Sequence, residues 1–395
     1  MERAAMLGTL GAFYFGAGRY VEAESAYRRA LAAVEGSPGA EVELGTSLNN
    51  VGFVCAQLGK YREAEQQYKR SLEIRRHSLG DAHPDTAATI GNLAALYRAL
   101  GRNQEAEPLF RRALEIRLAT AGAQSQETAV AKNNLAELYL AAGRYAEAER
   151  LFQEALETRE RLYGPDHPAV ALVLNNLGRL YQERGRTARA EQVHRRALAI
   201  REKAFGPEGA ETATSLNNLG TVLESQGRYR EAEEMYRRAL KIHEATLGPA
   251  HAEAAVQWSN LGNVAQRRGR HAEAETMFLK ALAIWETALG PTHAHVAIAA
   301  HNLAVTYMSM HRYDRAAHMY ERAIAIWERD PTDAVRLAMG LQHYAEAVRK
   351  SGRKKEAGQL EARSQAILAD HPEARYSTLG VDIRDLEAAS GFRPR

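Results

Sequence analysis

The stretch SLNNLG, residues 215–220, places two asparagines side by side among residues that otherwise favour a helix. Asparagine is a mediocre helix former, because its short amide competes with the backbone for hydrogen bonds. The pair nevertheless recurs, as SLNNVG at 47–52, AKNNLA at 131–136 and VLNNLG at 173–178. An unfavourable residue that returns in the same helical context indicates a repeated structural unit.

The second asparagine of the pair returns at intervals of 42 residues. It occupies Asn50, Asn92, Asn134, Asn176, Asn218, Asn260 and Asn302. In the first six of these units a glycine follows nine residues later, where a first helix would end in a left-handed cap. A constant period in the range of about 20–50 residues is typical of stacked supersecondary units.

Each unit has the pattern of two helices. In the unit that holds the quoted stretch, Leu216, Leu219 and Leu223 form one narrow apolar face, and Tyr229, Tyr236 and Leu240 belong to a second one after the glycine. The sequence therefore predicts an all-α solenoid of about nine antiparallel helix pairs. The predicted units are about 4–37, 42–80, 85–122, 127–164, 169–206, 211–248, 253–290, 295–330 and 333–369, followed by a tail, 371–395, that is disordered or docks elsewhere.

The unit resembles a known family. The order leucine, glycine or alanine, tyrosine, then G-[RK]-Y-x-E-A-E, then a ring and alanine is similar to the tetratricopeptide repeat. The 42-residue length and the tracts ALETRERLYGPDHP, 155–168, and ALAIREKAFGP, 197–207, resemble the longer variant of kinesin light chains and many bacterial proteins. The resemblance covers about residues 4–368 and implies a right-handed superhelix whose first helices line a concave groove.

Composition excludes several classes of function. The 52 basic and 49 acidic residues alternate along the chain, so no nucleic-acid footprint is visible. There is no signal-peptide pattern and no long apolar run, which predicts a cytoplasmic protein that does not enter a membrane. Nucleotide-binding, hydrolase and metalloprotease motifs are missing from the sequence, so we expect a non-enzymatic protein without metal or cofactor.

The resemblance assigns the second asparagine to the groove. A primary amide has two donors and two acceptor lone pairs, so it can bond both polar groups of one extended peptide unit. The family role is therefore to hold an extended segment of a partner protein, and the same seven asparagines are the candidate peptide-binding residues. The alternative is structural, because each amide could instead bond the backbone of the adjacent unit and fix the angle between units.

Neighbouring positions complete the candidate site. The first asparagine of the pair varies more along the chain, as specificity positions do, and Asn133, Asn175 and Asn217 are candidates for peptide contact. In each unit, the residues four before, three after and seven after the second asparagine share its helical face. We call each set of equivalent residues along the chain a column. Arg179 and Arg267 are the basic residues in these columns, too few to predict capture of a C-terminal carboxylate.

Two other functions remain open at this stage. The chain could be a structural module that self-assembles, with the tail 371–395 as one possible contact, or the sensor part of a larger effector system. The remaining recurring residues have structural interpretations. We expect the linker histidines to cap helices, Cys55 and His194 to fill the core, and the column that ends in Trp285 and Trp327 to pack internally.

Overall fold

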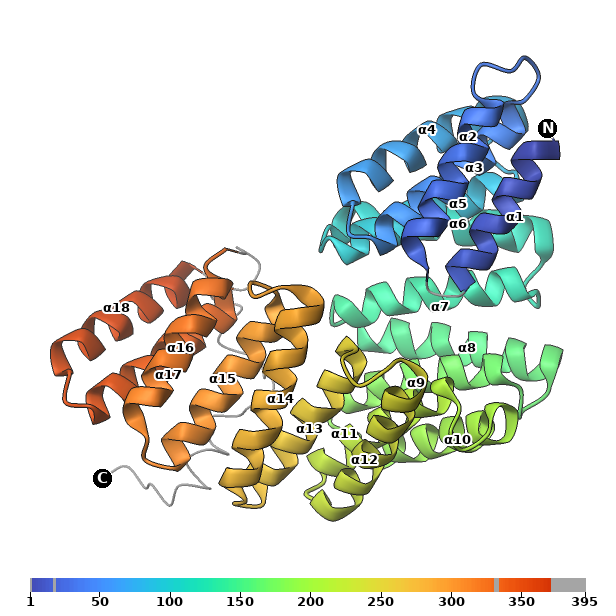
Figure 1. The fold of residues 1–395 in the computed structure, drawn as a ribbon. Helices are drawn as coiled ribbons and strands as arrows, with labels where there is room; N and C mark the ends of the chain where they lie inside the picture. The colour runs from blue at the N-terminus through green and yellow to red at the C-terminus, as the bar shows by residue number, and fades with distance from the viewer. Residues whose placement is uncertain (1, 17–18, 330–333, 371–395) are drawn as a thin grey trace. The chain divides into compact units, whose positions relative to one another are not determined.

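The computed structural model describes residues 2–16, 19–329 and 334–370, which form eighteen α-helices (Figure 1). The helices are α1 Glu2–Gly16, α2 Tyr20–Val34, α3 Glu41–Gln57, α4 Tyr61–Leu79, α5 Pro84–Ala99, α6 Asn103–Ala121, α7 Gln126–Ala141, α8 Tyr145–Tyr163, α9 Pro168–Glu183, α10 Thr187–Phe205, α11 Ala210–Ser225, α12 Tyr229–Thr246, α13 Ala252–Arg267, α14 His271–Leu289, α15 Ala294–Ser309, α16 Tyr313–Trp327, α17 Ala334–Lys350 and α18 Lys354–Asp370. The predicted all-α class and the nine helix pairs are confirmed. The predicted tail, 371–395, lies outside the described residues.

The chain divides into two compact units, Met1–Ile200 and Arg201–Arg395. Within each unit, a first helix packs against the second helix of its own pair and then against the second helix of the preceding pair. In the first unit the first helices α1, α3, α5, α7 and α9 also contact one another in series. Each unit is therefore a row of helix pairs in which side chains one period apart become neighbours.

The glycine nine residues after the second asparagine ends the first helix as predicted. Gly143 has φ 71°, and the following Arg144 N–H donates to Tyr139 O at 2.8 Å, which satisfies a carbonyl of the last turn. His311 occupies the equivalent position in a later pair, with φ 57°. The left-handed conformation is thus a requirement of the repeat, met even where the residue is not glycine.

Histidines in the linkers cap the next helix. The His83 Nδ1 atom accepts a hydrogen bond from the Asp85 N–H at 3.1 Å at the start of α5. The linker histidines His167, His251 and His293 make the same bond to the residue two positions on. The prediction that these histidines cap helices is confirmed, and no further role is needed for them.

The core of each pair is a ring of the second helix packed on a small residue of the first. Tyr236 is fully buried, and a Cβ built at Gly220 would lie 2.6 Å from its Cε1 atom. The same pairing of glycine and ring is found at Gly11 and Tyr27, Gly52 and Tyr68, Gly178 and His194, and Gly262 and Phe278. His194 is buried, so its predicted core role is confirmed, and burial lowers its pKa to about 4.

The column that ends in two tryptophans packs internally, as predicted. Arg75 is 4% exposed and donates to the Asp85 carbonyl at 2.6 Å and the Thr89 hydroxyl at 2.9 Å, both in the next first helix. Trp285 is 2% exposed and stacks on His295, ten residues further on. Whether the residue is arginine or tryptophan, the column ties one pair to the start of the next.

The ring contact predicts a stability difference between two glycines. Gly220→Ala forces the buried Tyr236 ring to shift and should destabilise the protein by about 1–3 kcal/mol. Gly91→Ala is the control, because an added Cβ there meets nothing within 4 Å. It should leave stability unchanged or raise it, by up to about 1 kcal/mol. Urea unfolding followed by circular dichroism measures both, and equal midpoints for the two variants would contradict the assignment.

Candidate functional site

The second asparagine bonds to the side chain of the preceding pair. Asn92 Nδ2 donates to Asn49 Oδ1 at 3.0 Å. Asn49 is the first of the two adjacent asparagines in the preceding helix pair. The same bond joins Asn176 to Asn133 at 3.0 Å and Asn260 to Asn217 at 2.9 Å. We call this bond between amides 43 residues apart a rung. The partner foreseen from the sequence was a backbone, of the neighbour or of a guest, whereas the observed partner is an amide side chain.

Rungs are reinforced by other polar groups. Glu137 Oε1 accepts from the Nδ2 atoms of both Asn133 and Asn176 at 3.0 Å, and its second oxygen accepts from Arg98 at 2.6 Å. Asn302 lies above Ser259, which is too short for a rung, and donates instead to Asn263 at 3.3 Å. Asn92, Asn176 and Asn260 therefore join adjacent helix pairs, through side-chain amides and not through the backbone.

The side chains of two second-position asparagines have no hydrogen-bond partner among the described residues. They are Asn50 and Asn134, and each faces a glycine at the first position of the preceding pair, Gly8 and Gly91 respectively. A Cβ added at either glycine would meet nothing within 4 Å. Glycine has no amide to accept a rung, so these two half-buried amides keep their donors and acceptors available. We call Asn50 and Asn134 the open amides.

The helical face around the second asparagine is exposed or half-buried along most of the chain. In the first unit it carries Phe53 at 37% exposure, Val130 at 38% and Leu172 at 52%. The column seven residues after the asparagine is exposed throughout. Val305, in the column three residues after, is the exception and is buried. The candidate face of the first unit thus presents amides beside exposed apolar side chains.

The other candidates divide between the two compact units. Arg179, on α9 of the first unit, and Arg267, on α13 of the second, are both exposed. Asn175 Oδ1 lies 3.3 Å from His194 Nδ1, and the Asn217 amide donates weakly to Asn218 Oδ1 at 3.5 Å. Within each described unit, no second arginine from these columns joins Arg179 or Arg267.

A second recurring contact joins neighbouring helix pairs through a glutamate, an arginine and a tyrosine. The Tyr97 hydroxyl donates to Glu65 Oε1 at 3.0 Å, Arg102 donates to Glu65 Oε2 at 2.9 Å, and the Arg102 guanidinium lies 4.0 Å from the centre of the Tyr97 ring. Bonds from Lys69, Arg102 and Tyr97 lower the pKa of Glu65 to about 2. Tyr139, Arg144 and Glu107 repeat this arrangement, so we call it the acid lock.

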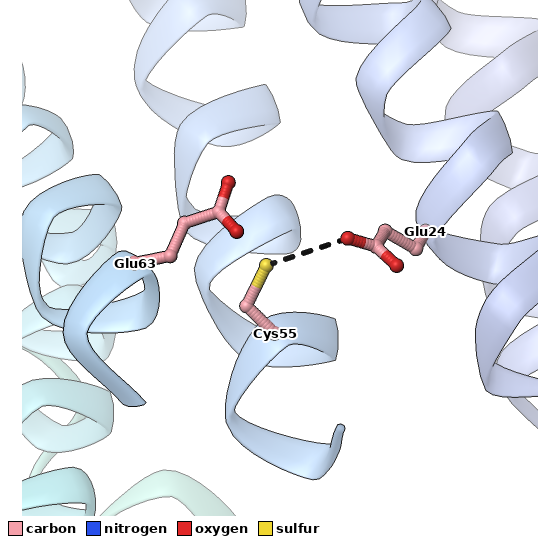
Figure 2. Close-up of side chains that lie close together, drawn as sticks. All are labelled: Glu24, Cys55 and Glu63. Atoms are coloured by element: carbon pink, nitrogen blue, oxygen red, sulfur yellow. Dashed lines mark hydrogen bonds between the residues drawn. The ribbon is translucent and has the colours of Figure 1, made fainter. Parts of the chain in front are cut away.

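Cys55 occupies the tyrosine position of the first acid lock (Figure 2). Its Sγ lies 4.0 Å from Glu24 Oε1, and Lys60, in the place of the arginine, donates to the same carboxylate at 2.7 Å. The donor atoms of Glu24, Cys55 and Glu63 lie within 4.8 Å of one another, close enough to surround a metal ion. Two cations already neutralise them, because Arg28 bonds both carboxylates, and burial together with Glu63 raises the thiol pKa to about 11. The cluster is therefore explained as an acid lock.

Two histidines replace a rung near the end of the array. His301 stands at the first position of its pair and His343 at the second position of the next, and their Nε2 and Nδ1 atoms lie 2.9 Å apart. Tyr320 and Trp327 pack around them, with centroid distances of 5.4 and 5.6 Å from His301. Burial lowers the pKa of His301 to about 3, with His343 adding to the shift, and lowers that of His343 to about 4.

Sequence reasoning missed the acid lock and the role of the glycines. Glu65 also pairs with Lys69 on its own helix at 2.7 Å, but its contact with the next helix pair was not predicted. The signal was present, since the basic residue after the helix-ending glycine recurs with the period of the asparagines, as does the tyrosine five residues before it in most units. Gly91 stands at the variable first position, where most units have asparagine, and it has no side chain to bond the next asparagine.

With this geometry in place, the comparisons identify the family. The tetratricopeptide repeat model matches residues 2–77, 43–119, 127–203, 190–245, 252–329 and 296–370. The chain belongs to the tetratricopeptide repeat family. None of the described helices is long and apolar enough to cross a membrane.

Solved structures of several repeat proteins are similar to this chain. BtubC (BKLC) from P. vanneervenii is 31% identical, with a TM-score of 0.47 over 58% of this chain and 91% of that one. A putative kinesin light chain from Podosopora anserina is 24% identical, with a TM-score of 0.46 over 53% of this chain and 98% of the other. A STAND protein with a tetratricopeptide repeat sensor from Pyrococcus horikoshii is 15% identical, with a TM-score of 0.60 over 88% of this chain and 53% of that one, a likeness of fold. No curated protein matches the sequence.

The histidine pair predicts a loss of stability in mild acid. The pKa values of both histidines are lower in the folded chain than the ordinary 6.5, so between pH 6.5 and about 4 the unfolded chain binds protons that the folded chain does not. Stability should therefore fall as the pH falls through this window. The double variant His301→Asn with His343→Asn removes both groups and supplies the amides of a rung, so its melting temperature should depend less on pH.

Thermal unfolding at pH 7, 6 and 5 measures this slope. His318→Asn changes an exposed histidine on α16 and serves as the control, which should keep the wild-type slope. A double variant that loses stability as steeply as the wild type would show that the pair does not titrate on unfolding.

Proposed function

We propose that the protein is a non-enzymatic scaffold that binds an extended segment of a partner protein along the exposed face of its first helices. The observation that supports this most is the pair of open amides, Asn50 and Asn134. Each is half-buried, carries unused donors and acceptors, and stands opposite a glycine with open space above it. An amide in this setting can bond one peptide unit of a guest through both its N–H and its C=O.

The apolar residues beside the open amides define the guest further. Phe53 lies one helical turn after Asn50, and Val130 lies one turn before Asn134, on the same faces. Leu172 holds the position of Val130 in the next pair and is half-exposed. A segment bonded at the two amides would therefore also bury apolar side chains here. We expect a peptide with apolar residues and little net charge, since exposed acids and bases on this face are few and of both signs.

The rung asparagines take the structural role within this proposal. Asn92, Asn176 and Asn260 fix neighbouring pairs to each other, while Asn49, Asn133 and Asn217 supply the acceptors. A buried or half-buried amide that loses its partner costs about 1–3 kcal/mol. Whether a second-position asparagine forms a rung or stays open depends on the first-position residue of the preceding helix pair. That residue is asparagine at a rung and glycine at an open amide.

A matched pair of variants tests the function. A library of unstructured displayed peptides is selected on the wild-type protein, and fluorescence polarisation then measures the affinity of a selected peptide for each variant. Asn134→Ala removes an open amide and should weaken binding by about 3- to 10-fold with little change in melting temperature. Asn92→Ala breaks a rung and should instead lower stability, by about 1 kcal/mol.

Gly91→Asn gives the complementary result. It places an acceptor opposite Asn134, so a rung should form, the melting temperature should rise and the peptide should bind more weakly. Selection of no peptide, or equal affinity for wild type and Asn134→Ala, would refute the proposed function.

A further inference from the structure

Aromatic side chains lie beside one of the two open amides. Phe53 follows Asn50 by one helical turn on α3, and its ring centre lies 4.7 Å from that of Phe15 on α1. The Phe15 ring in turn lies 5.1 Å from the ring of Tyr20, at the start of α2. Phe53 and Tyr20 are 37% and 36% exposed. We call Phe15, Tyr20 and Phe53 the aromatic cluster, and such exposed rings form a surface on which an apolar side chain can pack.

The equivalent positions beside the other open amide are charged. Glu137 follows Asn134 by one helical turn, as Phe53 follows Asn50, and it accepts a hydrogen bond from Arg98 at 2.6 Å. Arg98 belongs to the preceding helix pair, as Phe15 does relative to Phe53. Covering this ion pair with an apolar side chain would remove water from its charges, which is unfavourable. The two open amides therefore have neighbours of different chemistry.

The distance between the open amides sets the length of a guest that bonds both. Asn50 on α3 and Asn134 on α7 belong to the first compact unit, and both helices contact α5 between them. Packed helices lie about 8–10 Å apart, so the two amides are separated by roughly 16–20 Å. An extended chain advances about 3.3 Å per residue and covers that distance in about five or six residues.

The direction of the peptide groups favours the longer of these two spacings. Successive residues of an extended strand point their N–H and C=O groups to opposite edges, so residues an even number apart face the same edge. Both open amides stand at the same position of their helix pairs and meet one edge of the guest. A spacing of about six residues satisfies distance and direction together. Asn92, halfway along, would meet polar groups of the other edge, and its amide is already bonded in a rung.

We propose that the guest is an extended segment held at two peptide units about six residues apart, with a large apolar side chain that packs on the aromatic cluster beside the unit at Asn50. This inference rests on the proposed function and specifies its partner. The guest binds in one orientation, because the aromatic cluster flanks Asn50 whereas Arg98 and Glu137 flank Asn134. The exposed apolar side chain one turn before Asn134 is Val130, which suits a smaller apolar residue of the guest.

Amide-to-ester substitution along the guest tests the spacing. A peptide is selected from displayed peptides on the full wild-type chain, and each ester variant of it replaces one peptide N–H by oxygen. Esters at two positions about six residues apart should each weaken binding by about 3- to 10-fold, and esters an odd number of residues from these by less than about 2-fold. Asn50→Ala should remove the sensitivity at the position beside the large apolar residue, and Asn134→Ala the sensitivity at the other.

A second pair of variants tests the aromatic cluster. Phe53→Ser removes the ring beside Asn50 and should weaken binding of the selected peptide by about 10-fold. Alanine in place of the large apolar residue of the peptide should cost a similar factor with the wild type and little with Phe53→Ser. Leu118→Ser is the matched control, because Leu118 is 39% exposed on α6, a second helix, and this variant should bind like the wild type.

Failure of this inference differs from failure of the proposed function. Selection of no peptide, or equal affinity for wild type and Asn134→Ala, removes both. A peptide whose affinity depends on Asn134 overturns the inference alone if its two ester-sensitive positions lie an odd number of residues apart, if only one position is sensitive, or if Phe53→Ser binds it as tightly as the wild type.

Discussion

The packing of a ring on a small residue sets the distance between the two helices of each pair. Tyr236 is fully buried against Gly220, and no larger residue fits there without moving the ring. This close approach fixes how the two helices of a pair lie against each other, because a close-packed buried ring leaves little room for sliding. The alignment of polar groups 42 or 43 residues apart depends on that packing.

Two polar contacts then bind one helix pair to the next at different positions. The acid lock joins Glu65 to Arg102 and Tyr97 beside the solvent-exposed turn, and the rung joins Asn92 to Asn49 on the face of the first helices. Apolar stacking between them supplies most of the burial but has little directional preference. The polar contacts select one register of one pair on the next. The open amides arise at the places where this scheme omits a contact.

The sequence was sufficient for the fold because its period is constant. The spacing of Asn50 and its equivalents gave the number of helix pairs, and Gly143 and His83 marked helix ends that the structure confirms. The partners of the amides could not be predicted, because periodicity places Asn92 on a face without saying which neighbour lies opposite. To identify the partner one must know that the second position of one helix pair lies opposite the first position of the preceding pair, 43 residues earlier. The stacking of the pairs in space sets this offset. Arg102 and Glu65 were missed for the same reason.

We propose that the second-position asparagines are of two kinds, those bonded in a rung and those open to a guest peptide. Side-chain amide hydrogen exchange, measured by nuclear magnetic resonance on the 43.7 kDa chain, tests it directly. Exchange should be slow at Asn92, Asn176 and Asn260 with or without a selected peptide, and fast at Asn50 and Asn134 until the peptide binds and slows it. Equal exchange at all five amides, or peptide protection confined to the rung asparagines, would contradict it.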